Sequence, residues 1–182
     1  MGSLNRMTVI VKDNGFGIKN IIINEPKTYN SLSFKTLNIL INIFRRLEND
    51  NKTRVIILSG NGKGFSAGHN LKEVKNLKVR SKYLKLFNLC SKLMLNIVEG
   101  RKPVIAKVHG SAFAAGCQLA ASCDLAYASI DAKFATPGVN IGLFCSTPMV
   151  AVSRKIGKKR MMKMLLTGEP INARYAKEIG LI

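Results

Sequence analysis

Apolar and β-branched residues gather in short runs along the chain. Met7–Val11 and Gly17–Asn24 are two such runs, and the turn-forming triplet Asp13-Asn14-Gly15 separates them. Arg54–Ser59 and Val104–His109 are almost continuously apolar, as strands covered on both faces are. The pattern predicts an amino-terminal β-hairpin followed by buried strands.

Two longer segments carry apolar residues at helical spacing. The first, which Asn30 or Ser31 can cap, has a stripe formed by Leu37, Leu40, Ile41, Phe44 and Leu47. The second has a stripe formed by Tyr83, Phe87, Cys90, Met94 and Ile97. Both stripes predict amphipathic helices that pack against the strands.

The second half of the chain continues the alternation. A small-residue turn over Gly110–Ala115 leads into a predicted helix over Gly116–Ser122. Strands are expected over Asp124–Ala128 and Lys133–Ala135, and the chain is mainly helical from about Thr147. Strands that alternate with helices predict an α/β fold with parallel pairing, and no linker divides residues 1–182. We therefore expect a single domain.

Composition adds one question about partners. The 182 residues include 29 Lys and Arg against 10 Asp and Glu, a formal charge of +19. Such a surface attracts polyanions, among them nucleic acid, anionic lipid and coenzyme A. The positive charge is spread along the chain and is not gathered in one block. A general preference for Lys and Asn in this sequence therefore also explains it, without any polyanionic partner. No apolar run is long enough to span a membrane.

The cysteines and the amino terminus bear on the cellular compartment. Cys90, Cys117, Cys123 and Cys145 show no CxxC spacing, which favours buried free thiols in a reducing compartment. Residues 1–6 have no apolar signal-peptide core, and we find no clear targeting signal. A mitochondrial and a cytoplasmic location both remain open.

Two glycine-rich turns, Gly64–Glu73 and His109–Leu119, each run from a strand into a helix. Small residues there leave backbone N–H groups at the helix start uncovered, where they can stabilise negative charge. Two such turns that face each other would form an oxyanion hole. Neither turn is a Walker loop, and the second lacks GxGxxG spacing. Tight packing alone also explains such turns.

The residues of these turns resemble the crotonase superfamily of enoyl-CoA hydratases and isomerases. Phe65–Glu73 is similar to its first signature, and Pro103–Asp124 is similar to its second. Asn24–Ser33 and Leu166–Leu181 resemble further segments of that family, so the likeness covers nearly the whole chain. Phe134–Pro148 resembles the branch named for enoyl-CoA hydratase domain-containing protein 3.

The resemblance implies a spiral of ββα units that binds an acyl-CoA thioester. The oxyanion donors carry over to the backbone N–H groups of His69 and Ala115. The CoA-binding segment carries over to Ala67, Gly68, Asn70, Leu71 and Lys72. The family uses no metal and no tightly bound cofactor. It forms trimers or hexamers through carboxyl-terminal helices that this chain lacks, so we expect a homo-oligomer where those helices are present.

The chain departs from the family at its acid/base pair. The two glutamates of the hydratases align with Gln118 and Gly138, neither of which can transfer a proton. General acid–base catalysis contributes roughly 10²–10⁴-fold, so weak or absent hydratase activity is expected. Asn140, Cys145 and Ser146 are the nearby substitutes by sequence, and none has a carboxylate. Asp124 and Glu73 are interpreted as a structural cap and a helix-surface residue.

The sequence therefore predicts an acyl-CoA-binding protein of fatty-acid or lipid metabolism. If the protein is an enzyme, it is of the enoyl-CoA hydratase/isomerase type. One alternative is a non-catalytic regulator of lipid metabolism. Another is a basic RNA-binding homologue. The sequence has no RNP motif and no Trp, which argues against the RNA-binding alternative, so specific nucleic-acid binding is not expected.

Overall fold

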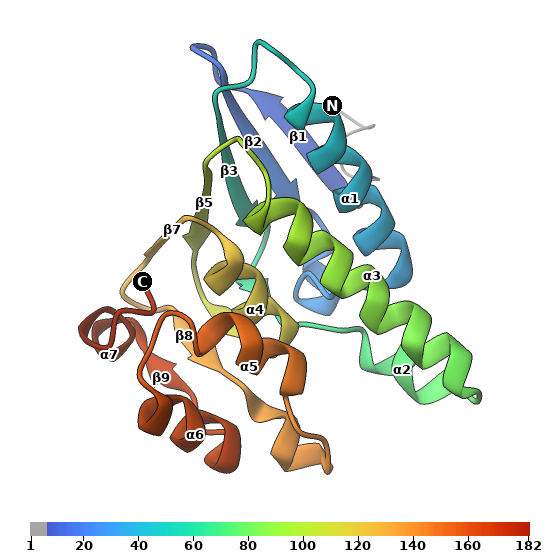
Figure 1. Ribbon diagram of the computed structural model, residues 1–182, viewed down its shortest axis with the longest axis vertical. Helices are drawn as coiled ribbons and strands as arrows, with labels where there is room; N and C mark the ends of the chain where they lie inside the picture. Colours follow the sequence, from blue (N-terminus) through green and yellow to red (C-terminus); the bar gives the residue numbers. More distant parts are fainter. Residues whose placement is uncertain (1–6) are drawn as a thin grey trace.

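A computed structural model describes residues 7–182, and the expectations for the amino terminus fall on residues 1–6, outside that part. Two sheets organise the chain (Figure 1). The larger sheet has the order β1-β2-β3-β5-β7, formed by Val9–Asp13, Ile18–Ile23, Val55–Gly60, Val104–Val108 and Leu125–Ala128. The smaller sheet has the order β4-β6-β8-β9, formed by Gly64–Ser66, Ser111–Phe113, Lys133–Ala135 and Ile171–Asn172.

The pairing confirms the predicted α/β fold with parallel strands. β1 and β2 form the antiparallel hairpin, and β2, β3, β5 and β7 then pair in parallel. The hairpin begins at Val9 rather than Met7, because Val9 is the first residue that pairs with β2, opposite Ile23. The predicted turn over Gly110–Ala115 contains a strand, β6, which pairs with β4 and β8.

One structural unit recurs along the chain. The consecutive pairs β3–β4, β5–β6 and β7–β8 each place one strand in the larger sheet and the next in the smaller one. Helices follow each pair: α2 (Leu71–Asn76) and α3 (Arg80–Val98), then α4 (Ala115–Ser122), then α5 (Ser146–Val152). This is the spiral of ββα units that the resemblance implied, and it stacks equivalent turns side by side.

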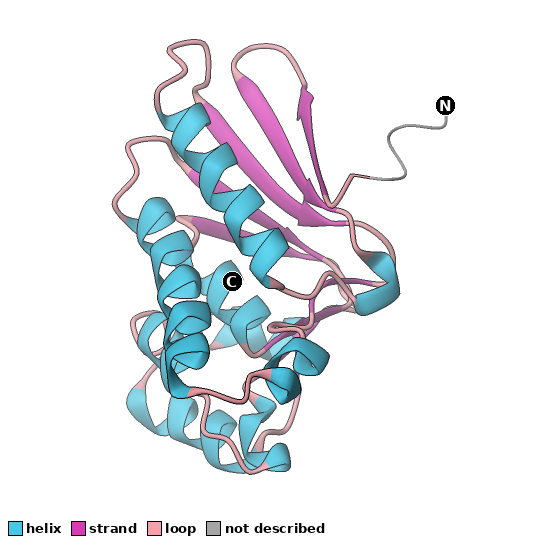
Figure 2. Ribbon diagram, turned by 90° about the vertical axis from the view of Figure 1, so that its right-hand side faces the viewer, coloured by secondary structure: helices cyan, strands magenta, loops and turns pink. Residues whose placement is uncertain are grey.

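Helices α1 (Phe34–Glu48) and α3 pack together on one face of the larger sheet (Figure 2). The predicted stripe of α1 is buried, from Leu37 to Leu47. Its cap is Ser33, whose hydroxyl accepts a hydrogen bond from the Thr36 N–H, and not Asn30 or Ser31. Asn30 instead uses its amide group to bind Asn61 O and Gly64 O. The expected cap is wrong because these distant carbonyls occupy that side chain.

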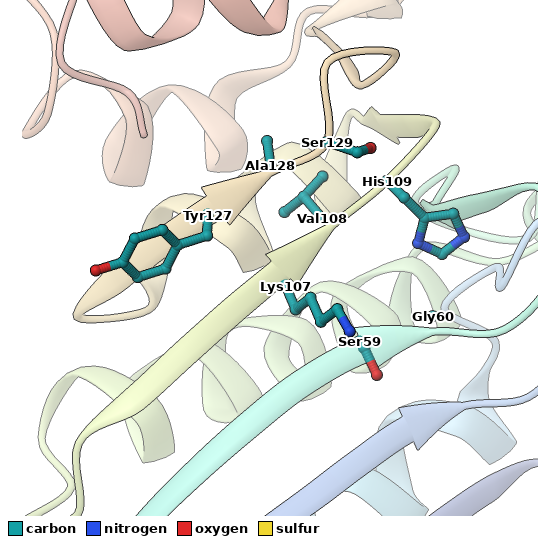
Figure 3. Close-up of a pocket in the computed structure, with 8 residues that line it drawn as sticks. All are labelled: Ser59, Gly60, Lys107, Val108, His109, Tyr127, Ala128 and Ser129. Carbon is teal, nitrogen blue, oxygen red and sulfur yellow. The ribbon is translucent and has the colours of Figure 1, made fainter.

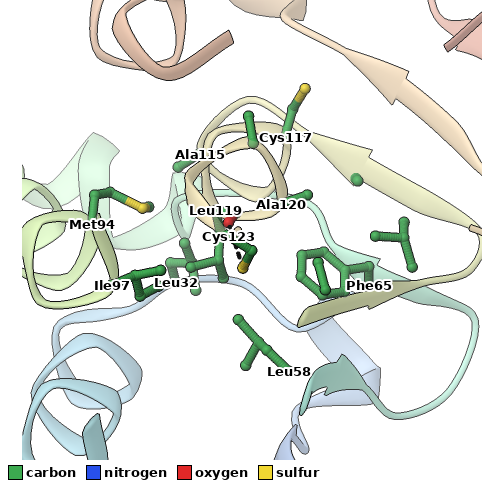
Figure 4. Close-up of a cluster of buried hydrophobic side chains, with 14 of the residues drawn as sticks. Leu32, Leu58, Phe65, Met94, Ile97, Ala115, Cys117, Leu119, Ala120 and Cys123 are labelled. Atoms are coloured by element: carbon green, nitrogen blue, oxygen red, sulfur yellow. Dashed lines mark hydrogen bonds between the residues drawn. The ribbon is translucent and has the colours of Figure 1, made fainter. Parts of the chain in front are cut away.

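The centre of the core lies where α3 and α4 meet the ends of the strands (Figure 4). Every residue of α4 is buried, which its small side chains permit. The buried face of α3 is centred on Leu86, Cys90, Leu93, Met94 and Ile97. Tyr83 and Phe87, which share the predicted stripe, lie at its margin, and Phe87 is 38% exposed. Apolar spacing therefore predicted the helix correctly, but the predicted buried face is rotated about the helix axis from the observed one.

The carboxyl-terminal part comprises η3 (Pro137–Ile141), α5, α6 (Lys158–Thr167), β9 and α7 (Ala173–Glu178). In this part, β9 and α7 pack on β8 of the smaller sheet, α5 packs on α4, and α6 packs on η3. A short 3-10 turn, η2 (Pro26–Thr28), precedes α1 at the other end. None of the helices described in residues 7–182 is long and apolar enough to cross a membrane.

Candidate functional site: two turns and a thiol

The first glycine-rich turn leaves β4 and enters α2. Gly68 has φ +86°, a conformation that favours glycine. Its carbonyl accepts a hydrogen bond of 2.7 Å from the Leu32 N–H, and the Ala67 N–H donates to Tyr29 O at 2.9 Å. The segment before α1 therefore fixes the path of this turn on one side.

The second turn leaves β6 and enters α4 through a strained residue. Ala114 has φ 49° and ψ −119°, which an L-residue rarely adopts and which costs on the order of 1–3 kcal/mol. Its N–H donates to Ala135 O at 2.9 Å, and its carbonyl accepts from the Gln118 N–H at 3.0 Å. This backbone geometry sets the direction of the next N–H group, that of Ala115.

The two turns touch. A Cβ atom added to Gly68 would lie 2.9 Å from the Ala115 nitrogen, and one added to Gly116 would lie 2.1 Å from the Ser66 carbonyl oxygen. Glycine at these two positions is therefore what lets the backbones approach. The Ala115 amide lies against the residue that precedes His69 in the chain.

The amides of His69 and Ala115 have no acceptor of their own. Among the hydrogen bonds of residues 7–182, neither N–H is a donor. Ala115 is 1% exposed, so its N–H is also shielded from bulk water. A buried N–H without an acceptor is rare because it costs free energy, and it indicates a place where a ligand atom can bind. Two such groups on touching turns suit one negatively charged oxygen.

The contacts of the His69 side chain are those of a packed aromatic ring and not those of a proton donor or acceptor in catalysis. Its Nδ1 lies 3.4 Å from Leu32 O, and its ring meets the ring of Phe87 edge-on at 5.5 Å. Its Nε2 is buried without a partner among the described residues. Burial lowers the pKa of the His69 imidazole, although the Leu32 hydrogen bond and the Glu73 charge oppose that shift. The ring is therefore neutral near pH 7 and packs as an aromatic group.

Gln118 occupies a buried place on the first turns of α4. It is 5% exposed, and its Oε1 accepts a weak hydrogen bond of 3.9 Å from the Cys90 thiol. Neither of these groups is ionised near pH 7, because burial raises the pKa of Cys90 to about 12. This position therefore offers an amide and a protonated thiol, and no base.

Gly138 lies against the thiol of Cys145, a contact that sequence spacing does not predict. Its N–H donates to the Cys145 Sγ at 3.2 Å, and an added Cβ would lie 2.8 Å from that sulfur. The same Cβ would lie 2.9 Å from the Leu143 carbonyl oxygen. Burial raises the pKa of Cys145, and the Gly138 hydrogen bond opposes this. Cys145 thus fills the space beside Gly138 as a neutral thiol.

The remaining candidates have structural partners. Asn70 caps α2 by accepting from the Lys72 and Glu73 N–H groups, while Leu71 and Lys72 are exposed. Glu73 is not a free surface residue: its Oε2 accepts from the Phe34 N–H at 3.0 Å and so caps α1. Asp124 accepts from the Val104 N–H at 2.7 Å, which joins the starts of β5 and β7.

Asn140 and Ser146 are not gathered with the two turns by any described contact. The Asn140 side chain lies against Gly168, and the Ser146 N–H donates to Phe144 O. Both are exposed. All four cysteines are free and buried, as the sequence predicts. Within residues 7–182, no group of three His, Cys, Asp or Glu could hold a metal ion.

A hollow of about 510 Å³ lies elsewhere. It opens on the face of the larger sheet that α1 and α3 leave uncovered (Figure 3). Lys107, Tyr127 and Ser59 line it, and His109 at its edge is bound through Nε2 to Gly62 O at 2.8 Å. None of the residues of the two turns lines this hollow, so its size does not make it the site.

Comparison with known proteins agrees with this architecture. Residues 13–182 match the family described as enoyl-CoA hydratase/isomerase. The chain is 48% identical over 166 residues to the human protein named enoyl-CoA hydratase domain-containing protein 3, mitochondrial, covering 91% of this chain and 55% of that protein. It is 36% identical over 176 residues to the mitochondrial enoyl-CoA hydratase of Pongo abelii, covering 94% and 58%.

Solved structures give the same result. The crystal structure of human enoyl-CoA hydratase domain-containing protein 3 matches with a TM-score of 0.93 and 45% identity, over 97% of this chain and 69% of that one. An enoyl-CoA hydratase of Mycobacterium smegmatis matches with a TM-score of 0.95 and 45% identity, over 97% and 68%. The chain thus spans less than two thirds of the length of these curated relatives. It belongs to the enoyl-CoA hydratase/isomerase family, the crotonase superfamily, and to the branch of domain-containing protein 3.

Proposed function

We propose that this chain binds an acyl-CoA thioester and holds its carbonyl oxygen with the backbone N–H groups of His69 and Ala115. The observation that carries the proposal is that two N–H groups without acceptors lie on touching turns. A thioester carbonyl gains negative charge when its α-carbon loses a proton, and two fixed N–H donors stabilise that charge. The helix dipole of α4 adds to the effect at Ala115.

Binding is expected to exceed catalysis. Hydration needs a base to activate water and an acid to protonate carbon, and donors to the carbonyl oxygen supply neither. Gln118 and Gly138 stand at the two positions that would supply them. The adjacent thiols of Cys90 and Cys145 are protonated because their pKa values are raised. Turnover of crotonyl-CoA should therefore fall far below the roughly 10 s⁻¹ of a median enzyme.

Calorimetric titration with CoA, acetyl-CoA and a longer acyl-CoA tests the proposal. We expect the thioesters to bind, and Gly68→Ala to abolish their binding, because the added methyl group would press on the Ala115 nitrogen. Gly15→Ala is the matched control: Gly15 also has positive φ, +76°, but an added Cβ there meets nothing within 4 Å. Equal binding by both variants would contradict the proposed oxyanion site.

Restoring hydratase chemistry requires more than two glutamates. Gln118→Glu with Gly138→Glu places the second side chain against the Cys145 sulfur and the Leu143 carbonyl. Cys145→Ala removes the first obstacle, so the triple variant is the informative one. Hydration by the wild-type chain at the rate of an ordinary hydratase would show that another residue carries the proton transfer.

We propose a location from the names of the relatives and an assembly state from the family, and neither proposal rests on this site. Mitochondrial proteins are named among the relatives, which favours a mitochondrial location for this one. Imaging of a tagged full-length protein tests that. We also infer a homo-oligomer, trimeric or hexameric, which sedimentation velocity of the full-length protein measures.

A further inference from the structure

Gln118 leaves half of its side-chain amide unpaired. Its Oε1 accepts from the Cys90 thiol on α3 at 3.9 Å, and this contact orients the amide. Its Nε2 donates to no acceptor among the hydrogen bonds of residues 7–182, although the residue is only 5% exposed. A buried N–H group without an acceptor costs free energy, so the free amide nitrogen indicates a place where a ligand atom can bind.

This nitrogen borders open space. Some side-chain atoms of residues 7–182 are both unpaired and sealed from solvent, and Gln118 Nε2 is not one of them. The rest of the Gln118 side chain is packed between α4 and α3, which contact each other. A small group that enters from the open side can therefore reach the amide nitrogen without displacing the core.

Two helices place Gln118 beside the oxyanion donors. On α4, Gln118 follows Ala115 by three residues, so the two side chains share one face with their Cβ atoms about 5–6 Å apart. On α3, Phe87 meets the His69 ring edge-on. Cys90, three residues later on the same helix, meets the Gln118 amide. Both helices therefore put Gln118 about one helical turn from the proposed oxyanion site.

The groups gathered here are neutral donors. The N–H groups of His69 and Ala115 form one pair, and Gln118 Nε2 is a third donor close by. The thiols of Cys90 and Cys145 stay protonated because burial raises their pKa values. Fixed donors stabilise electron-rich oxygen atoms. The arrangement therefore suits a ligand with two such oxygens, one at the oxyanion donors and one beside Gln118.

One carboxylate acts on this region without occupying it. The charge of Glu73 opposes the lowering of the His69 pKa. Its Oε2 accepts from the Phe34 N–H at 3.0 Å, at the start of α1. Glu73 is thus engaged by α1, and no described contact joins it to Gln118.

We propose that the site selects 3-oxoacyl thioesters, with Gln118 Nε2 donating to the oxygen on C3. This inference rests on the proposed function, because the thioester oxygen must occupy the donors of His69 and Ala115. Only a few bonds separate the two oxygens of such a ligand, so one helical turn can serve both. A saturated acyl chain has only hydrogen atoms on C3 and leaves the Gln118 N–H unpaired. Sites that bind a polar group discriminate against ligands that lack it.

The same donors favour the enolate of a 3-oxoacyl thioester. A proton on C2, between two carbonyl groups, is acidic and passes to water, so the step needs no base from the protein. The electron pair of the broken C2–H bond spreads over the thioester oxygen and the C3 oxygen. Donors fixed at both oxygens stabilise that charge more than water does, because they need no reorganisation.

Titration of the full-length protein with acetoacetyl-CoA and with butyryl-CoA, which differ at C3, tests the proposal. We expect calorimetry to show that acetoacetyl-CoA binds about tenfold more tightly, the usual effect of a hydrogen bond to a charged group. The near-ultraviolet absorbance of the enolate should rise on binding at constant pH. 3-Hydroxybutyryl-CoA, which has no second carbonyl group, should bind less tightly than acetoacetyl-CoA.

Gln118→Met removes the donor and keeps an unbranched side chain of similar length. It should abolish the roughly tenfold preference for acetoacetyl-CoA and leave the affinity for butyryl-CoA nearly unchanged. Retained butyryl-CoA binding shows in the same experiment that the variant is folded. Gln118→Leu repeats the test with a second apolar side chain.

Ser122→Ala is the matched control. Ser122 is also buried on α4, one turn after Gln118, and its hydroxyl donates to the Gln118 carbonyl oxygen at 2.8 Å. Its loss should change neither the preference nor the enolate absorbance. Equal wild-type affinity for acetoacetyl-CoA and butyryl-CoA would overturn the selection and leave thioester binding intact, as would an equal loss of both affinities in Gln118→Met. If no thioester bound at all, the proposed function would fail first.

Discussion

The turns before α2 and α4 touch each other, yet they reach their backbone geometry in different ways. The first uses a glycine, Gly68, for its positive φ, and Asn70 caps the helix that follows. The second places an alanine, Ala114, at φ 49° and has no side-chain cap. In the first turn, the residue types suit the backbone conformation that they adopt. The second persists only because the surrounding strands hold it.

Gly116→Ala should produce the largest effect, because it attacks the packing that holds the second turn. Its methyl group would lie 2.1 Å from the Ser66 carbonyl oxygen, and backbone cannot rotate away as a side chain can. We expect a loss of about 3 kcal/mol or more in the free energy of unfolding. Urea denaturation measures it. Gly157→Ala, where an added Cβ meets nothing within 4 Å, is the control and should change stability little.

Asn70→Ala should cost about 1 kcal/mol, the usual contribution of an N-cap side chain. The cap accepts hydrogen bonds from the Lys72 and Glu73 N–H groups, and alanine cannot. Asn70→Asp retains an acceptor oxygen and should preserve stability. A loss of the same size in both variants would show that Asn70 acts by something other than capping. Denaturant midpoints at constant slope distinguish these outcomes.

Ala114→Gly should stabilise the chain by about 0.5–1 kcal/mol, because relief of backbone strain exceeds the added entropy of the unfolded glycine. Ala67→Gly is the equivalent change in the first turn, where the residue lacks positive φ, and should destabilise. The two substitutions thus change the free energy of unfolding in opposite directions if backbone strain is confined to the second turn. Thermal unfolding of both variants decides the question, and destabilisation by Ala114→Gly would refute the comparison.

The smallest expected effect is a pH dependence due to His69. Burial holds the pKa of His69 below its ordinary value near 6.5, so the unfolded chain binds a proton more readily than the folded chain. Stability should therefore fall as pH drops below about 6.5, until the folded-state pKa is reached. His69→Phe keeps an aromatic ring beside Phe87 and should remove this slope. His109→Gln should leave it in place, which denaturation at several pH values would verify.

Cys145 illustrates why the site could be predicted only in part. Motif alignment predicts Gly138 as the position of a missing carboxylate, and Cys145 is one of three nearby substitutes by sequence. The structure puts the thiol directly against Gly138, where its sulfur lies 2.8 Å from the place of an added Cβ and so blocks a side chain. A pair seven residues apart across a 3-10 turn has no periodic signature, so only the folded backbone reveals the contact.

The long elements were decided by the sequence itself. The buried stripe of α1, the hairpin and the continuous apolar strands arise from periodicity that local spacing encodes, and the family follows from motifs in chain order. The tertiary structure decided the rest. Strands of three residues, β4 and β6, exist only through their partners. The start of α1 also depends on tertiary contacts, because Asn30 binds the distant Asn61 and Gly64 carbonyls and Glu73 accepts from the Phe34 N–H across the fold. Such hydrogen bonds form only after folding has brought donor and acceptor together.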